Sequence, residues 1–114
     1  MPEHSSLTTE RWAKFTRTQQ IIQVACEMQR GSNRTECNDR VNLKHCYERA
    51  LRLAELTIAV SDDASLQRQL SDWREEIAAL SMHEKPDASA HRNLYRILLL
   101  LDPEASKQIE YLGL

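Results

Sequence analysis

Three pairs of oppositely charged residues are the first candidates for chemistry in this chain. Each pair lies on or beside the apolar stripe of a helix-patterned segment. Arginine forks bind carboxylates and phosphates through two parallel hydrogen bonds, so such a set could bind an anionic ligand. It could equally form an ion-pair network that fixes how helices pack, which is the interpretation we favour. The set is Glu27, Arg30, Glu48, Arg49, Arg74 and Glu75.

Arg40 and His45 offer a second kind of chemistry. The stretch Arg-Val-Asn-Leu-Lys-His that they bound resembles the arginine-histidine motif of the helical nuclease families called HEPN. In those families the arginine stabilises anionic charge at an RNA phosphate while the histidine moves a proton. Five residues along an ideal helix turn the second side chain about 140° from the first. This rotation separates the two side chains on one helix, so a HEPN-like ribonuclease, or the partner of a toxin–antitoxin nucleotidyltransferase, is the alternative function and not the favoured one.

The three cysteines do not have the spacing of a metal site. Cys26, Cys37 and Cys46 contain no Cys-x-x-Cys pair, and zinc needs four converging ligands. We expect reduced thiols, no metal and no cofactor, in a cytoplasmic protein.

The placement of glycine and proline predicts an all-α protein. The chain has only two glycines and three prolines, and none interrupts a stretch of helical periodicity. Apolar residues recur at spacings of three and four over 9–30, 36–60, 64–82 and 88–101. Asp102-Pro103-Glu104 then predicts the start of a short last helix.

The breaks between these segments are short and polar. Gly31 is expected to end the first helix in a left-handed conformation, with a turn following it. Short connections favour antiparallel neighbours. We therefore expect one domain over residues 1–114, an antiparallel four-helix bundle with a short additional C-terminal helix and a frayed segment at 1–8.

Net charge and hydropathy indicate which classes of binding partner are not expected. The 114 residues carry 15 basic and 17 acidic side chains, a net charge of −2, so nucleic-acid binding is not expected. The longest apolar run, 97–101, is far below the roughly 20 residues that cross a bilayer. Leu99 and Leu100 point away from the inward stripe of their helix. Either this helix is buried on all sides or these residues leave an apolar strip exposed. An exposed strip favours a non-enzymatic protein that associates with proteins, most simply as a homodimer, which is the function we expect.

Three segments resemble a group of small bacterial helical proteins. They are Ala-Cys-Glu-Met-Gln-Arg at 25–30, Glu-Arg-Ala-Leu to Leu-Thr-Ile at 48–58, and Trp-Arg-Glu-Glu-Ile at 73–77. The resemblance covers about residues 10–80 and ends after residue 83. It implies that the six charged residues above are a shared polar set. It implies no activity, because the members of the group are described only as hypothetical proteins.

Overall fold

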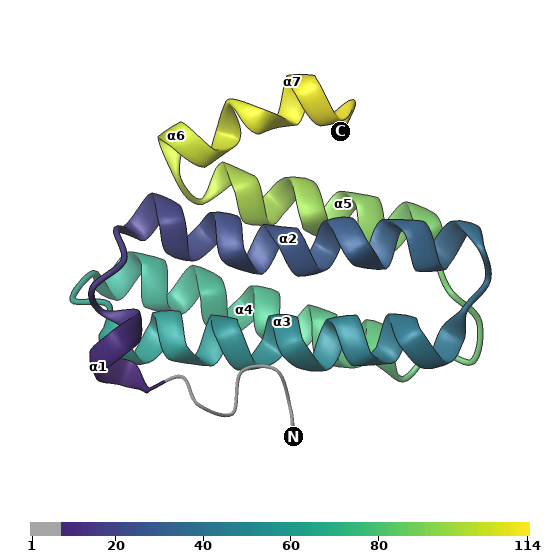
Figure 1. Ribbon diagram of the computed structural model, residues 1–114, viewed down its shortest axis with the longest axis horizontal. Helices are drawn as coiled ribbons and strands as arrows, with labels where there is room; N and C mark the ends of the chain where they lie inside the picture. Colours follow the sequence, from purple (N-terminus) through teal and green to yellow (C-terminus); the bar gives the residue numbers. More distant parts are fainter. Residues whose placement is uncertain (1–7) are drawn as a thin grey trace.

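The computed structural model describes residues 8–114, and this part of the chain is helical without any strand. Four long helices dominate it, and three short ones flank them (Figure 1). The long helices are α2 (Arg17–Glu36), α3 (Arg40–Val60), α4 (Ala64–Ser81) and α5 (Ala88–Leu100). The short helices are α1 (Thr9–Trp12), α6 (Pro103–Ser106) and α7 (Gln108–Leu112).

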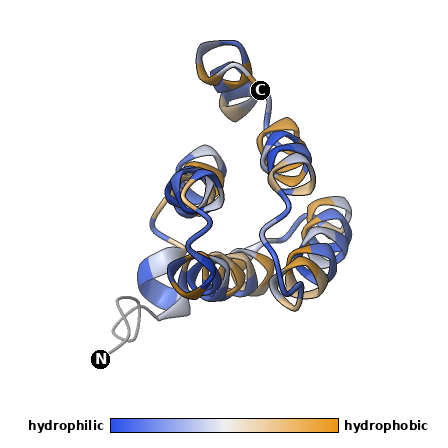
Figure 2. Cartoon of the chain, turned by 90° about the vertical axis from the view of Figure 1, so that its right-hand side faces the viewer, coloured by the Kyte–Doolittle hydropathy of each residue, from blue (hydrophilic) through white to orange (hydrophobic). Residues whose placement is uncertain are grey.

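The four long helices enclose one apolar core. Helix α2 packs against α3 and α5, and α4 packs against the same two helices. Figure 2 shows the short α6–α7 segment on the outer side of α5. The Cα radius of gyration is 13.4 Å, close to the roughly 13 Å of a compact domain of this length. The largest fully buried side chains include Trp12, Tyr47, Trp73, Leu53, Leu70 and Leu98.

The helix expected over 9–30 is broken after Trp12, which corrects the prediction. Thr16 begins α2 with a capping box, in which its side chain accepts from the Gln19 amide while the Gln19 side chain accepts from the Thr16 amide. The buried side chain of Gln20 donates to the carbonyl of Trp12 at 3.0 Å. These contacts satisfy backbone groups on both sides of the break, so the chain turns there at little cost.

Gly31 does not end a helix, which is a second correction. It is buried in α2, where a Cβ atom would lie 2.7 Å from Cε1 of His91. Glycine therefore allows the close approach of α5 and is not a left-handed stop. The turn comes seven residues later at Asn38, whose φ of 54° is left-handed, and Asp39 caps α3.

The remaining boundaries follow the sequence closely. Helix α3 begins at Arg40, four residues after the expected start at 36. Helices α4 and α5 each end one residue before the expected 82 and 101. Asp102 caps α6 with Pro103 in its first turn, as the sequence predicts, but α6 and α7 share the last segment. Of the segment 1–8 expected to fray, residues 1–7 lie outside the described residues, and Thr8 caps α1.

Leu99 is a further correction. Its side chain is fully buried in the core, whereas Leu100 is 57% exposed. Leu99 follows the buried Tyr95 by four residues and the buried His91 by eight, so it lies on the buried face of α5 and not opposite it. The apolar surface predicted from this pair therefore includes Leu100 and not Leu99.

Candidate functional site

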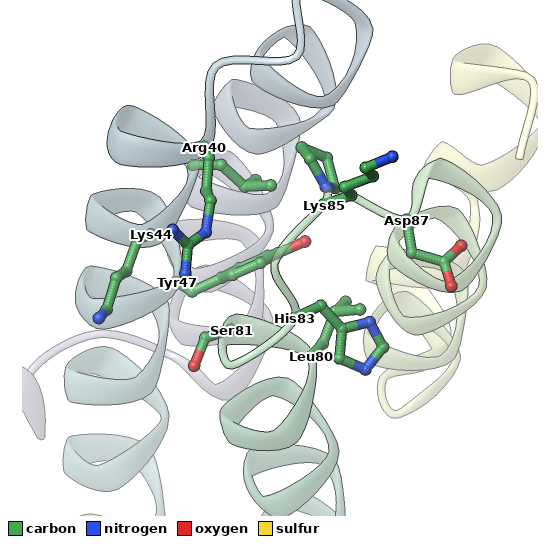
Figure 3. Close-up of a pocket in the computed structure, with 10 residues that line it drawn as sticks. Arg40, Lys44, Tyr47, Leu80, Ser81, His83, Lys85 and Asp87 are labelled. Atoms are coloured by element: carbon green, nitrogen blue, oxygen red, sulfur yellow. The ribbon is translucent and has the colours of Figure 1, made fainter.

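A small basic pocket lies where the first turns of α3, the end of α4 and the loop between α4 and α5 meet (Figure 3). Arg40 and Lys44 come from successive turns of α3, and His83 and Lys85 come from the loop. Tyr47 forms the inner wall. The cavity measures about 10 Å³, which is room for a single water-sized group.

The positive charges of this pocket have no anionic partner within residues 8–114. The side chains of Arg40, Lys44, His83 and Lys85 make neither a hydrogen bond nor an ion pair there. Asp87 also lines the pocket, but its Oδ1 accepts from the Ala90 amide at 3.0 Å and caps α5. The pocket therefore gathers positive charge in a chain whose net charge is −2.

Behind the pocket, Tyr47 connects to a buried histidine. The Tyr47 hydroxyl lies 2.7 Å from Nδ1 of His91, and Nε2 of His91 lies 2.8 Å from the carbonyl of Met28. A carbonyl oxygen only accepts, so Nε2 carries the proton and Nδ1 accepts from Tyr47. Ser32 Oγ lies 3.1 Å from the same Nε2 and donates to the Met28 carbonyl at 3.1 Å. The histidine is thus fully bonded in its neutral form.

Burial reinforces the neutral state of both rings. Loss of solvent lowers the pKa of His91, and the hydrogen bond to the Met28 carbonyl offsets only part of this effect. Burial raises the pKa of the Tyr47 phenol. The hydrogen bonds of this network join α2, α3 and α5.

Three of the six predicted charged residues do meet. Glu27 is 2% exposed on α2; it accepts from Arg30 on its own helix at 2.8 Å and from Nε of Arg49 on α3 at 2.9 Å. Arg49 also reaches Sγ of the buried Cys46 at 3.5 Å. This Glu27 cluster links α2 to α3 and has a carboxylate at its centre, so its arginines are already neutralised.

The other three residues lie apart from the Glu27 cluster. Arg74 on α4 pairs with Glu55 on α3 at 3.1 Å, and its Nε is buried without a hydrogen-bond partner in the described chain. Glu48 and Glu75 are exposed, and neither makes an ion pair with another described residue. The six residues therefore form two separate contacts between helices and no single site.

The two residues of the nuclease-like motif also separate. Arg40 lines the basic pocket, whereas His45 is exposed on α3 and is not among the residues that line it. The histidine that shares the pocket with Arg40 is His83, from the loop after α4.

The cysteines are free thiols in three different settings. Cys26 and Cys37 are exposed, and Cys46 is buried, which raises the pKa of its thiol. No group of three metal-ligating side chains occurs among residues 8–114.

Sequence reasoning missed His83, Lys85 and His91. His91 could have been found from its spacing, because it precedes Leu94 by three residues and Leu98 by seven on the inward face of α5. Lys44 follows Arg40 by four residues and hence lies on the same helix face. Nothing local indicates that His83 and Lys85 join them, since that contact depends on how α3 and α4 pack.

Comparison with known proteins does not assign this chain to a family. No protein-family model, curated protein or solved structure matches the chain. In the described part, no helix has the length and apolar character required to cross a membrane.

Proposed function

We propose that this protein is a non-enzymatic association module whose simplest partner is a second copy of itself. The observation that carries the proposal is the apolar surface of the C-terminal segment. Tyr111 is 87% exposed, Leu100 is 57% exposed and Leu112 is 39% exposed. Large apolar side chains of this kind are typical of protein interfaces, in which tyrosine is also enriched.

The position of α7, outside the four long helices, supports this proposal. We propose that α2 to α5 form an antiparallel four-helix bundle, because the connections at 37–39, 61–63 and 82–87 are short and neighbouring helices pack in sequence order. Helix α7 packs against α5 and α6. Its other side is free to contact a second chain.

The test is the oligomeric state of the protein, measured by size-exclusion chromatography with light scattering over a range of concentrations. We expect a concentration-dependent dimer that Tyr111→Glu and Leu100→Glu weaken. Gln23→Glu adds the same charge on an exposed turn of α2 and should leave the dimer intact. A monomer at every concentration would remove the proposal of self-association.

A HEPN-like ribonuclease is the second candidate, favoured by the unpaired Arg40 in a basic pocket. Because His45 lies outside that pocket, a second copy would have to supply the histidine. This candidate predicts RNA cleavage that both Arg40→Ala and His45→Ala abolish. Absence of cleavage, or cleavage that survives either substitution, would exclude it.

A further inference from the structure

We propose that the basic pocket formed by Arg40, Lys44, His83 and Lys85 docks the carboxylate side chains of an acidic, partly apolar protein segment. This inference concerns a different surface from the C-terminal one, so it does not depend on self-association. The partner is defined by its chemistry: glutamate or aspartate side chains alternating with apolar ones.

The charge of the pocket is the first argument. Some exposed charges elsewhere have a near neighbour of opposite sign, such as Arg17 with Asp63 at 3.1 Å and Lys107 with Glu104 at 3.1 Å. The pocket has three lysine or arginine side chains and one histidine, while its single carboxylate, Asp87, caps a helix. An incoming carboxylate would supply the missing negative charge, and the arginine fork can bind it through two hydrogen bonds.

Two exposed apolar residues adjoin pocket residues in the sequence, beside the acidic Asp39 and Glu84, and they are the second argument. Val41 follows Arg40 and is 68% exposed; Met82 lies between Ser81 and His83 and is 75% exposed. Exposed methionine is common on surfaces that accept varied apolar partners. A phosphate backbone would gain nothing from these two side chains, whereas a protein segment with apolar residues between its acids would contact them.

The size of the pocket is the third argument. A cavity of about 10 Å³ cannot enclose a nucleotide or a metabolite. It can receive one carboxylate oxygen at a time from a segment lying across the surface.

The test is an NMR titration of the ¹⁵N-labelled 114-residue protein. A synthetic peptide of alternating glutamate and leucine is added, and the chemical shifts of the backbone amides are measured. We expect shifts at 40–47 and 80–88. Arg40→Gln/Lys85→Gln should weaken binding about tenfold, equivalent to 1.4 kcal/mol. The matched control is Arg68→Gln/Arg96→Gln, which removes two exposed charges from α4 and α5 and should leave the affinity within about twofold.

Two further ligands complete the experiment. A peptide with glutamine in place of glutamate should bind at least about tenfold more weakly. Single-stranded RNA of matched charge should bind more weakly than the acidic peptide. The proposal is overturned if the peptide does not bind at millimolar concentration, if both double variants weaken it equally, if the glutamine peptide binds as well, or if RNA binds more tightly. The same titration on Tyr111→Glu separates this result from that of the dimer test.

Discussion

The Glu27 cluster and the basic pocket use the same helix, α3, for opposite purposes. Arg49 in the cluster is 26% exposed and is paired with a carboxylate that is 2% exposed. Arg40, nine residues earlier, is exposed and lines the pocket without a partner within the described residues. Two arginines on one helix thus differ because one faces α2 and its buried glutamate, whereas the other faces the end of α4 and its basic loop.

This difference distinguishes charged residues that stabilise the fold from charged residues that are available to bind a partner. A buried ion pair has already exchanged water for its partner, so removing one member leaves the other desolvated and alone. An exposed charge without a partner keeps its water, and its removal costs the fold little. Stability measurements should therefore respond to the cluster, and binding measurements should respond to the pocket.

The largest expected effect is the loss of the carboxylate in the cluster. Glu27→Gln keeps the shape of the side chain but removes the carboxylate that accepts from Arg30 and Arg49. We expect the free energy of unfolding in urea to fall by about 2 kcal/mol, less than the 3–5 kcal/mol of a fully buried pair, because Arg49 can reach water. Glu48→Gln, at an exposed position of α3, should change it by less than about 0.5 kcal/mol. Equal effects of the two substitutions would remove the structural role of the cluster.

Gly31→Ala tests the packing of α2 on α5 between the two regions. The added methyl group meets His91 at 2.7 Å, where something must move. Overpacking costs about 1–3 kcal/mol, and the higher helix propensity of alanine returns up to about 1 kcal/mol. We expect a net loss of about 1 kcal/mol, measured by urea unfolding. A gain in stability would show that α5 approaches α2 less closely than the structure has it.

The buried His91 predicts a pH dependence of the free energy of unfolding. Because burial lowers the pKa of His91 in the folded state, only the unfolded chain binds this proton just below about pH 6.5. The contribution of His91 to the free energy of unfolding is therefore fully present above that pH. It is lost as the pH falls from there toward the lower pKa of the folded state, with a slope of up to about 1.4 kcal/mol per pH unit. Urea unfolding between pH 5 and 8 should show this slope, and His91→Gln should flatten it. If His91→Gln leaves the slope unchanged, the assignment to the buried ring is wrong.

The smallest expected effect on stability comes from the pocket. Arg40→Gln and Lys85→Gln should change the free energy of unfolding by less than about 0.5 kcal/mol, since neither side chain makes an ion pair or hydrogen bond with another of residues 8–114. Thermal unfolding of the two variants measures this. A loss of more than 1 kcal/mol would mean that the pocket charges hold the fold together, and the contrast with the cluster would fail.

The sequence predicts the long helices better than it predicts the contacts between them. Periodicity places α4 within one residue, because its apolar seam and its aspartate cap are local features. Gly31 was misassigned because its role is set by His91, 60 residues away, and no local pattern shows that approach. The capping box at Thr16 and Gln19 was present in the sequence and was overlooked.

Among the candidate site residues, too, contacts within one helix are easier to predict from the sequence than contacts between helices. Spacing alone groups Glu27 with Arg30, and the structure confirms that pair at 2.8 Å. The choice of Arg49 as the second partner depends on the rotation of α3 against α2. The apolar pair at the end of α5 separates because Leu99 continues the buried face of His91 and Tyr95, whereas Leu100 lies one residue further round the helix and is exposed.

The account is tested most directly by urea unfolding of wild type, Arg49→Gln and Arg40→Gln, each with and without the acidic peptide. A ligand that binds only the folded state raises its stability by an amount fixed by affinity and concentration, so one measurement reports both properties. We predict that Arg49→Gln lowers stability and keeps the peptide-induced gain, whereas Arg40→Gln keeps stability and loses most of that gain. Two variants that behave alike, or that exchange these behaviours, would contradict the distinction between paired and unpaired charge.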